Sequence, residues 1–194
     1  MRIIGGSFRG THLADPGAGD AAAHLRPTTD RVRESIFNLL TNGRTGDLVR
    51  GQRVLDLFAG TGALGLEALS RGAAQVTFVD DGAAARALIR ANIERLRAMG
   101  TTRLYRRDAT DLGANRGPGF GLVILDPPYG KGLGARALAS ALAGGWLAPG
   151  AHVLWEENAP QTPPPGFSHV DTRRYGETHV TLLRLTAPDA SEHG

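Results

Sequence analysis

The sequence predicts an α/β fold in which a mostly parallel sheet carries helices on both faces. Short apolar runs alternate with longer segments of helical period, and the chain of 194 residues with 41% hydrophobic content suffices for one domain plus an appendage. Ligand sites in such folds lie at the carboxyl ends of the strands. We expect strands at 53–58, 75–79, 102–106, 121–125 and 150–155, and helices at 62–71, 82–98 and 132–143.

The first 50 residues read as a hairpin-and-helix extension to this domain. Residues 1–13 predict a hairpin with turns at Gly5-Gly6 and Arg9-Gly10, and 15–23 predict a mobile loop rich in glycine and alanine. Thr28 or Thr29 can cap a helix whose apolar positions fall at i, i+4, i+7 and i+8, namely Val32, Ile36, Leu39 and Leu40. Arg31 and Arg33 lie off this stripe and are expected on a solvent-facing side.

The C-terminal part predicts an antiparallel end to the sheet. Segments 167–175 and 179–185 are separated by Gly176-Glu177 and read as a hairpin, which gives seven strands with an antiparallel last strand. We therefore expect the main domain at 51–186 and a disordered tail at 187–194.

A glycine-rich turn joins the first expected strand to the first helix of the domain. Gly60, Gly62 and Gly65 fit the spacing G-x-G-x-x-G, which lets a ligand approach the backbone and a helix pack closely on a strand. Nicotinamide, flavin and S-adenosylmethionine (SAM) sites all use this spacing, and so do glycines that serve packing alone.

Carboxylates near the turn narrow the choice of ligand. Asp80 follows the second strand, 20 residues after Gly60, where it can accept hydrogen bonds from ribose hydroxyls. Asp56 precedes the turn, where it would repel a pyrophosphate but attract a sulfonium or an ammonium, and SAM carries both cations. Asp108-Ala109 follows the third strand, where the acid either binds an adenine amine or caps a helix.

The most informative motif is Asp126-Pro127-Pro128-Tyr129, directly after the apolar run 122–125. Proline fixes its own φ angle and restricts the backbone angles of the residue before it, so the motif presents an extended backbone at a strand end. Asp126 and the Pro127 carbonyl can accept hydrogen bonds from an exocyclic amine, while Tyr129 stacks on its ring. A strand that ends in a proline-rich turn is the alternative.

In order along the chain, these motifs resemble those of class I SAM-dependent methyltransferases with a Rossmann-like fold, and DPPY resembles the amino-methyltransferase version. Segments 1–10 and 26–38 are similar to N-terminal signatures of RsmD-type 16S ribosomal RNA guanine-N2 methyltransferases, so the resemblance covers residues 1 to about 185. It implies SAM as the cofactor and 16S ribosomal RNA of the small subunit as the partner. Asp80 stands where glutamate is usual, and Thr11-His12 replace a more basic pair.

The resemblance also implies roles for individual residues. The cofactor residues would be Asp56, Phe58, Ala59, Gly60, Thr61, Gly62, Asp80, Asp81, Asp108 and Ala109. The catalytic residues would be Asp126, Pro127, Pro128 and Tyr129. The residues that contact RNA would be Arg9, Arg26, Thr28, Thr29, Arg31, Arg33 and Lys131.

Charge is distributed unevenly along the sequence. The net charge is +3, and residues 1–53 hold eight arginines against five acids, 8 − 5 = +3, so the remainder is neutral. A basic lobe beside a neutral core is the footprint expected for docking to a phosphate backbone.

Composition excludes several chemistries. The absence of cysteine excludes disulfides, thiolate zinc sites and radical SAM clusters, and it argues against cytosine-C5 methylation through a cysteine adduct. The histidines show no metal-ligand spacing, and no run approaches the ~18 apolar residues of a membrane span. We expect a cytoplasmic monomer without a metal. Trp146 and Trp155 are expected in the core or in strand-edge packing. Glu156-Glu157 ends a strand near the predicted pocket and could shape it, but a solvated surface position is favoured.

DPPY cannot separate guanine-N2 from adenine-N6 chemistry, because the two amines differ in ring position more than in reactivity. A DNA amino-methyltransferase is the alternative enzyme, although the chain lacks an obvious DNA-recognition domain. A non-catalytic RNA-binding or assembly protein with a SAM fold is a third hypothesis, against which the intact motifs argue.

Overall fold

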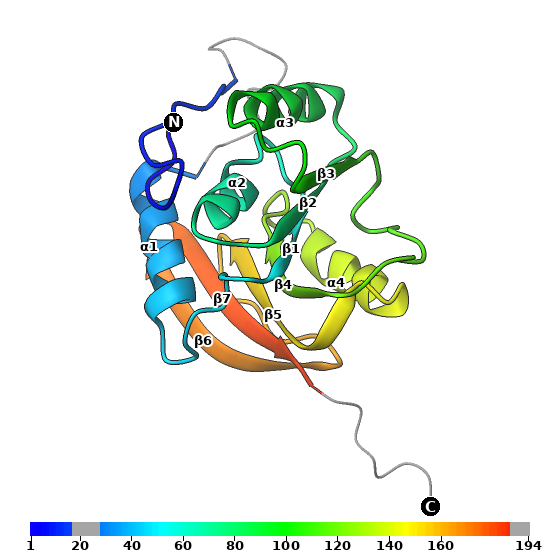
Figure 1. The fold of residues 1–194 in the computed structure, drawn as a ribbon. Coiled ribbons are helices and arrows are strands. Elements are labelled where there is room, and N and C mark those ends of the chain that lie inside the picture. Colours follow the sequence, from blue (N-terminus) through cyan, green and yellow to red (C-terminus); the bar gives the residue numbers. More distant parts are fainter. Residues whose placement is uncertain (17–27, 187–194) are drawn as a thin grey trace, which may run out of the picture.

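The computed structural model describes residues 1–16 and 28–186, and a seven-stranded sheet runs through its centre (Figure 1). The strands are β1 (Arg53–Leu57), β2 (Gln75–Val79), β3 (Thr102–Tyr105), β4 (Phe120–Leu125), β5 (Leu147–Glu157), β6 (Phe167–Tyr175) and β7 (Thr178–Leu185). The helices are α1 (Asp30–Asn42), α2 (Ala63–Ser70), α3 (Ala83–Arg95) and α4 (Leu133–Ala143). In these described residues no helix has both the length and the apolar character of a membrane span.

The order of the strands is β3-β2-β1-β4-β5-β7-β6. β1 to β5 pair in parallel, whereas β7 is antiparallel to both β5 and β6. This confirms the predicted mostly parallel sheet with an antiparallel last strand. β5 is longer than predicted, because its pairing with β4 continues on both sides of an irregularity between Phe120 and Leu122.

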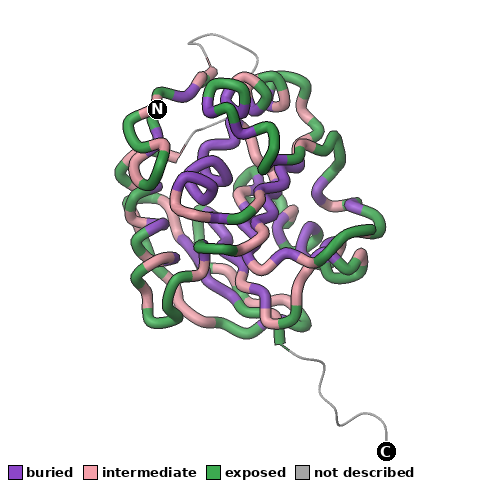
Figure 2. The backbone as a smooth tube through the Cα atoms, viewed as in Figure 1, coloured by how far each residue is buried: buried purple, intermediate pink, exposed green. Residues whose placement is uncertain are grey.

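Two hydrophobic cores lie on opposite faces of the sheet. Alternate strand residues such as Val54 and Phe78 pack with α1, α2 and α3, whereas Leu55 and Val79 pack with α4. Figure 2 shows that the buried residues concentrate in the central strands and in α2, between the exposed outer segments. Trp146 and Trp155 are buried in the second core, as predicted.

The first 14 residues pack against the first core. Residues 1–13 form the predicted hairpin. An antiparallel bridge joins Arg2 to His12, and the Ile3 N–H donates to the Thr11 carbonyl at 2.9 Å. Ile3 is fully buried, and the N–H groups of Ile4 and Gly5 each donate to the Glu67 carboxylate at 2.9 Å. Residues 17–23 of the predicted mobile loop lie outside the described residues.

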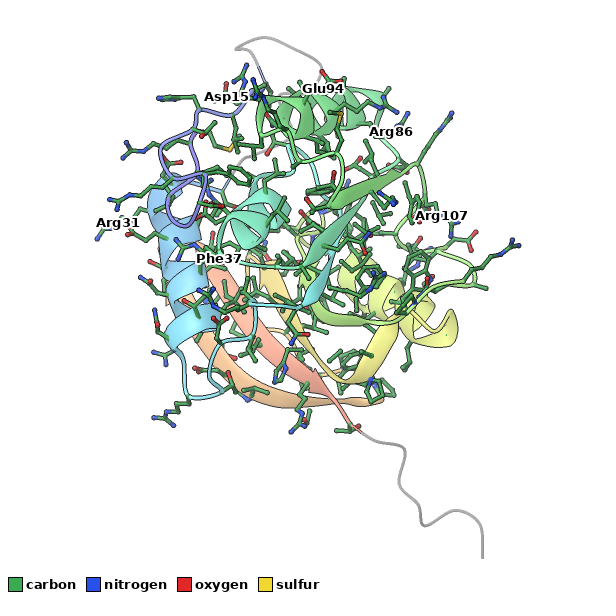
Figure 3. All side chains as sticks on the ribbon, in the orientation of Figure 1. Asp15, Arg31, Phe37, Arg86, Glu94 and Arg107 are labelled. Carbon is green, nitrogen blue, oxygen red and sulfur yellow. The ribbon has the colours of Figure 1, made fainter. Side chains whose placement is uncertain are left out.

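The buried face of α1 differs from the predicted one. Thr29 caps the helix as predicted, since its hydroxyl accepts from the Val32 N–H at 3.2 Å. The buried residues are Arg33, Ile36, Phe37 and Leu40. Figure 3 shows Arg31 projecting away from the helix, as expected for a solvent-facing residue.

The prediction that Arg33 faces solvent is wrong. Its side chain is fully buried, its Nη2 lies 2.8 Å from Asp30 Oδ1, and its Nε lies 3.5 Å from Glu67 Oε2. It also donates to the carbonyls of Thr28 and Arg2. Because two carboxylates and two carbonyls neutralise and bind the guanidinium, Arg33 can replace an apolar residue on the buried stripe.

Candidate active site

The predicted site motifs meet at one edge of the sheet. β1 lies between β2 and β4, and Leu57 is in register with Val79 on one side and with Leu125 on the other. The segments that follow these three strands therefore leave the sheet side by side, at its carboxyl edge. This is the position where parallel α/β sheets bind ligands.

The glycine turn after β1 has the backbone shape that a close ligand contact requires. Phe58, Gly60 and Gly62 have positive φ angles of 56°, 60° and 79°. A positive φ is uncommon for a residue with a side chain, and such strained residues concentrate at ligand sites. Gly65 serves packing, because an added Cβ would lie 2.4 Å from Phe78 Cε1.

Asp80 joins the glycine turn to the end of β2. Its Oδ2 accepts from the Gly60 N–H at 2.9 Å and its Oδ1 from the Gly82 N–H at 2.8 Å. Burial raises the pKa of Asp80, although these two hydrogen bonds favour its ionised form. Asp81, the next residue, is exposed.

Asp56 lies beneath the glycine turn. It is 1% exposed, and its Oδ2 accepts from the Gly65 N–H at 3.0 Å near the start of α2. Burial raises the pKa of this carboxyl well above its usual range. The contact with α2 means that Asp56 supports the turn from below.

Asp108 stands in a tight turn after β3. Its Oδ1 accepts from the Thr110 N–H at 2.8 Å and from the Thr110 hydroxyl at 2.7 Å, and these bonds lower its pKa. The helix-cap alternative for Asp108 is wrong, because no helix follows it before β4. Asp108 is exposed, while Ala109 is buried against the second core.

Sequence reasoning missed Asn92, which holds the other side of the turn. This buried α3 residue donates from Nδ2 to the Thr61 carbonyl at 3.0 Å, and its Oδ1 accepts from the Ala14 N–H at 2.7 Å. One amide therefore connects the glycine turn to the N-terminal segment. A single polar residue on a helix gives no sequence signal for such a contact.

The segment after β4 lies beside a cluster of buried carboxyl groups. Pro127 is buried, whereas Tyr129 is 38% exposed and donates its hydroxyl to Glu156 Oε1 at 3.1 Å. Glu157 accepts from the Gly130 N–H at 3.2 Å. Glu156 and Glu157 are 3% and 5% exposed, so the prediction that they lie on the surface is wrong.

The position of these glutamates was available from the sequence. They end β5, which runs parallel to β4 with Trp155 in register with Leu125. Acids that end neighbouring parallel strands necessarily meet at the same edge. We call Asp126, Glu156 and Glu157 the acidic cluster.

Burial and nearby negative charge raise the pKa values of two members of the acidic cluster, Asp126 and Glu156. Burial raises the pKa of Asp126 well above its usual range, and the negative charges of Glu156, Asp56 and Glu157 raise it further. Burial likewise raises the pKa of Glu156 and of the Tyr129 phenol. Asp126 is therefore poised to exchange a proton closer to neutral pH than an ordinary aspartate.

The residues predicted to contact RNA separate into several groups. Arg9, Arg31 and Lys131 are exposed. Thr28 donates to Glu156 at 3.1 Å, which brings the N-terminal segment to the acidic cluster, while Thr29 caps α1 and Arg33 is buried. Arg26 lies outside the described residues. Among the described residues, no group of three or more acidic or histidine side chains could hold a metal ion.

The sequence matches a known protein family and is similar to a methyltransferase of known name. Residues 1–184 match the family model described as conserved hypothetical protein 95. The chain is 40% identical over 196 residues to ribosomal RNA small subunit methyltransferase D of Escherichia coli K12, covering 99% of this chain and 93% of that protein.

Solved structures of methyltransferases have the same fold. The Escherichia coli protein yhhF, classed as a methyltransferase, superposes with a TM-score of 0.81 at 36% identity, covering 97% of this chain and 99% of that one. TrmN from Thermus thermophilus superposes with a TM-score of 0.63 at 28% identity, covering 85% of this chain and 51% of that one.

Proposed function

Because the chain belongs to the RsmD-type methyltransferase family, we propose that it transfers a methyl group from SAM to a guanine N2 in ribosomal RNA. The substrate we infer is the 16S RNA of the small ribosomal subunit, in agreement with the name of the Escherichia coli relative. The geometry at the carboxyl edge of the sheet supports each part of this proposal.

The glycine turn and Asp80 support the SAM site. Three residues with positive φ expose backbone groups before α2, and Asp80 ends the adjacent strand at the same edge. A carboxylate at this place can accept hydrogen bonds from ribose hydroxyls through lone pairs that its backbone partners leave available. Asp108 and Ala109 follow the next strand and fit the adenine end of the same ligand.

The acidic cluster is the observation that carries the choice of guanine. Guanine presents N1–H and the N2 amino group side by side, so its Watson–Crick edge offers adjacent donors. Adenine presents an acceptor at N1 beside its amino group. In its ionised form, the form that can take up the amine proton, Asp126 only accepts hydrogen bonds. That form fits the donors of the guanine edge and opposes the acceptor of the adenine edge, and Glu156 lies close enough to interact with it.

The proposed chemistry is a direct displacement. SAM supplies a methyl carbon already activated by its sulfonium. Tyr129 stacks on a guanine that has been turned out of the RNA, and Asp126 with the Pro127 carbonyl orients the amine. As the N–C bond forms and the C–S bond breaks, the amine proton passes to Asp126, whose raised pKa makes it the better acceptor.

Two measurements test the parts of this proposal separately. Calorimetry should show SAM binding that Asp80→Ala weakens about tenfold or more, because the ribose loses a charge-assisted hydrogen bond of about 1.5–3 kcal/mol. Asp80→Glu, which keeps the carboxylate, is the matched control and should bind well. Equal SAM affinity in both variants would remove Asp80 from the nucleoside site.

The second measurement separates RNA from DNA as the substrate. Labelled methyl groups from SAM should enter RNA of unmethylated small subunits and leave duplex DNA unlabelled. Labelling of DNA at adenine would establish the amino-methyltransferase alternative. SAM binding without transfer to either polymer would indicate a non-catalytic protein.

A further inference from the structure

One face of the sheet lacks the helix that a parallel crossover usually supplies. β3 lies at the edge, and the chain returns from it past β2 and β1 to β4 through residues 106–119, which form no helix. α4 packs on this face, in the core that includes Val123 and Leu125 of β4. The part of the face over β1, β2 and β3 is covered by side chains and by this connection.

A groove of about 310 Å³ lies over that part of the face. Four arginines line it together with aromatic rings, and we call it the arginine groove: Arg53, Arg103, Arg107, Arg116, Tyr105 and Trp146. No acidic residue lines it, and within residues 1–16 and 28–186 none of these arginines forms an ion pair. The groove is therefore a concentration of uncompensated positive charge.

Two of the four guanidinium groups lie over aromatic rings. Arg107 lies 5.3 Å from the Tyr105 ring centroid and 5.6 Å from that of Trp146, and Arg53 lies 4.8 Å above Phe120. Figure 3 shows Arg107 on the side of the molecule away from Arg31 and α1. Arg53 Nε is buried without a hydrogen-bond partner, and Tyr105 remains 37% exposed.

This chemistry fits a single-stranded nucleic acid. Arginines bind phosphates through planar, paired N–H groups, and an exposed tyrosine with stacked guanidinium groups offers flat surfaces to bases. An acidic peptide would use the charges but not the flat surfaces. We propose that the arginine groove binds a single-stranded segment of the RNA substrate, an inference that rests on the proposed function.

The position of the groove relates it to the reaction. Tyr105 is in register with Val79, at the carboxyl edge, whereas Arg53 begins β1 at the opposite edge. The groove thus starts beside the segment that carries Asp108 and extends about one strand length, roughly 17 Å, from the catalytic edge. RNA held there would continue from the nucleotides around the methylated base.

The test uses two double variants that each remove two exposed charges. Arg103→Gln with Arg116→Gln alters the groove, and Arg90→Gln with Arg97→Gln is the matched control, because Arg90 and Arg97 are exposed outside both the groove and the basic N-terminal lobe. The probe is a fluorescein-labelled single-stranded RNA of mixed sequence, and anisotropy is measured over a salt series. The groove variant should bind about tenfold more weakly, and its salt slope should fall by about 0.7 for each lost phosphate contact. The control should bind within about twofold of the unaltered protein.

Tyr105 provides a second, local readout. Tyr105→Ala should weaken binding about fivefold or more through lost base stacking, while Tyr105→Phe should bind normally. With a 5-iodouridine probe, crosslinking and mass spectrometry should identify the peptide that contains Tyr105. Circular dichroism of each variant checks the fold.

Equal affinity and salt slope in the two double variants, with crosslinks confined to other peptides, would overturn the proposal and show that the arginines only cover the sheet. Methyl transfer by the unaltered protein is scored separately. If the protein transfers no methyl group while the groove still binds RNA, the proposed function is wrong and RNA binding by the groove is retained. If methyl transfer succeeds and the groove variant has the same RNA affinity and salt slope as the control, only the inference about the groove is wrong.

Discussion

Asp126 combines a stability cost with a proposed catalytic role. Burial and three neighbouring carboxyl groups raise its pKa, which means that ionising it in the folded protein is unfavourable. The pKa of Asp126 in the folded state lies above its value in the unfolded state. Its contribution to the free energy of unfolding is therefore fully present at low pH and is lost as the pH rises through the raised pKa. A group that destabilises the fold at working pH is typical of a functional site.

Replacing Asp126 by asparagine should therefore move activity and stability in opposite directions. Turnover should fall by about 10²–10³, because a positioned acceptor for the amine proton is lost. The melting temperature at pH 8 should rise relative to that of the unaltered protein, and the gain should shrink as the pH is lowered toward 4. Methyl-transfer kinetics and thermal denaturation over a pH series measure both effects.

The SAM affinity of this variant is its internal control and should remain within severalfold of normal. Full turnover would remove Asp126 from the chemistry. At each pH, the difference in melting temperature between the variant and the unaltered protein is compared. A smaller gain at pH 8 than at pH 4 would contradict the electrostatic account of the acidic cluster.

Tyr129 offers a ring for stacking and a hydroxyl bound to Glu156, and two substitutions separate these roles. Tyr129→Ala should lose stacking of about 1–3 kcal/mol and so reduce kcat/KM by about fivefold or more. Tyr129→Phe should retain most of the activity, although Glu156 loses a hydrogen bond. Equal damage from both substitutions in steady-state assays would assign the essential role to the hydroxyl.

At the scale of elements, the contact between α1 and α2 depends on the buried pair of Arg33 and Glu67. Arg33→Gln should destabilise the protein by about 3–5 kcal/mol, because it removes a fully buried guanidinium that pairs with Asp30 and Glu67 and leaves Glu67 with Arg71 as its counter-charge. Arg31→Gln, two residues away on the exposed side, should change the free energy of unfolding by less than about 0.5 kcal/mol. Urea denaturation compares them directly. Similar stability of the two variants would show that the ion pair contributes little to the fold.

The elements themselves were largely predictable, because apolar periodicity and glycine positions determine where strands and helices begin. Every expected strand and helix from 53 to 185 is present, and Thr29 caps α1 as its position predicted. Periodicity failed for Arg33, since counting apolar residues cannot recognise an arginine that is neutralised by Asp30 and Glu67. Asp30 is three positions away, but Glu67 lies 67 − 33 = 34 positions further along the chain, so only the fold brings it to Arg33.

At the scale of the whole molecule, charge along the sequence did not predict charge in space. The N-terminal excess of +3 includes Arg33, which is buried, and Arg2, which pairs with Asp30 at 3.6 Å. The formally neutral remainder separates in the fold into the acidic cluster at the carboxyl edge and three arginines of the arginine groove, Arg103, Arg107 and Arg116, whereas the fourth, Arg53, belongs to the N-terminal excess. Sums over segments hide such a separation because they add charges that the fold places apart.

The site could be predicted where its residues belong to contiguous motifs, as in the glycine turn and DPPY. Asn92 contributes from α3, and only the packing of that helix brings it to the glycine turn. Glu156 and Glu157 end β5, so their edge of the sheet was predictable but their burial was not. The proposed choice between guanine and adenine rests on Asp126 with these two glutamates. It is therefore a structural inference more than a sequence one.

The most direct test of the central claim is mass spectrometry of nucleosides and fragments from 16S RNA, after unmethylated small subunits are incubated with the protein and SAM. We expect one added methyl group in a single fragment, recovered as N2-methylguanosine, and formation of the same product about 10²–10³-fold more slowly with the Asp126→Asn variant. Methylation recovered on adenosine N6, or on guanosine at a ring nitrogen, would contradict the account.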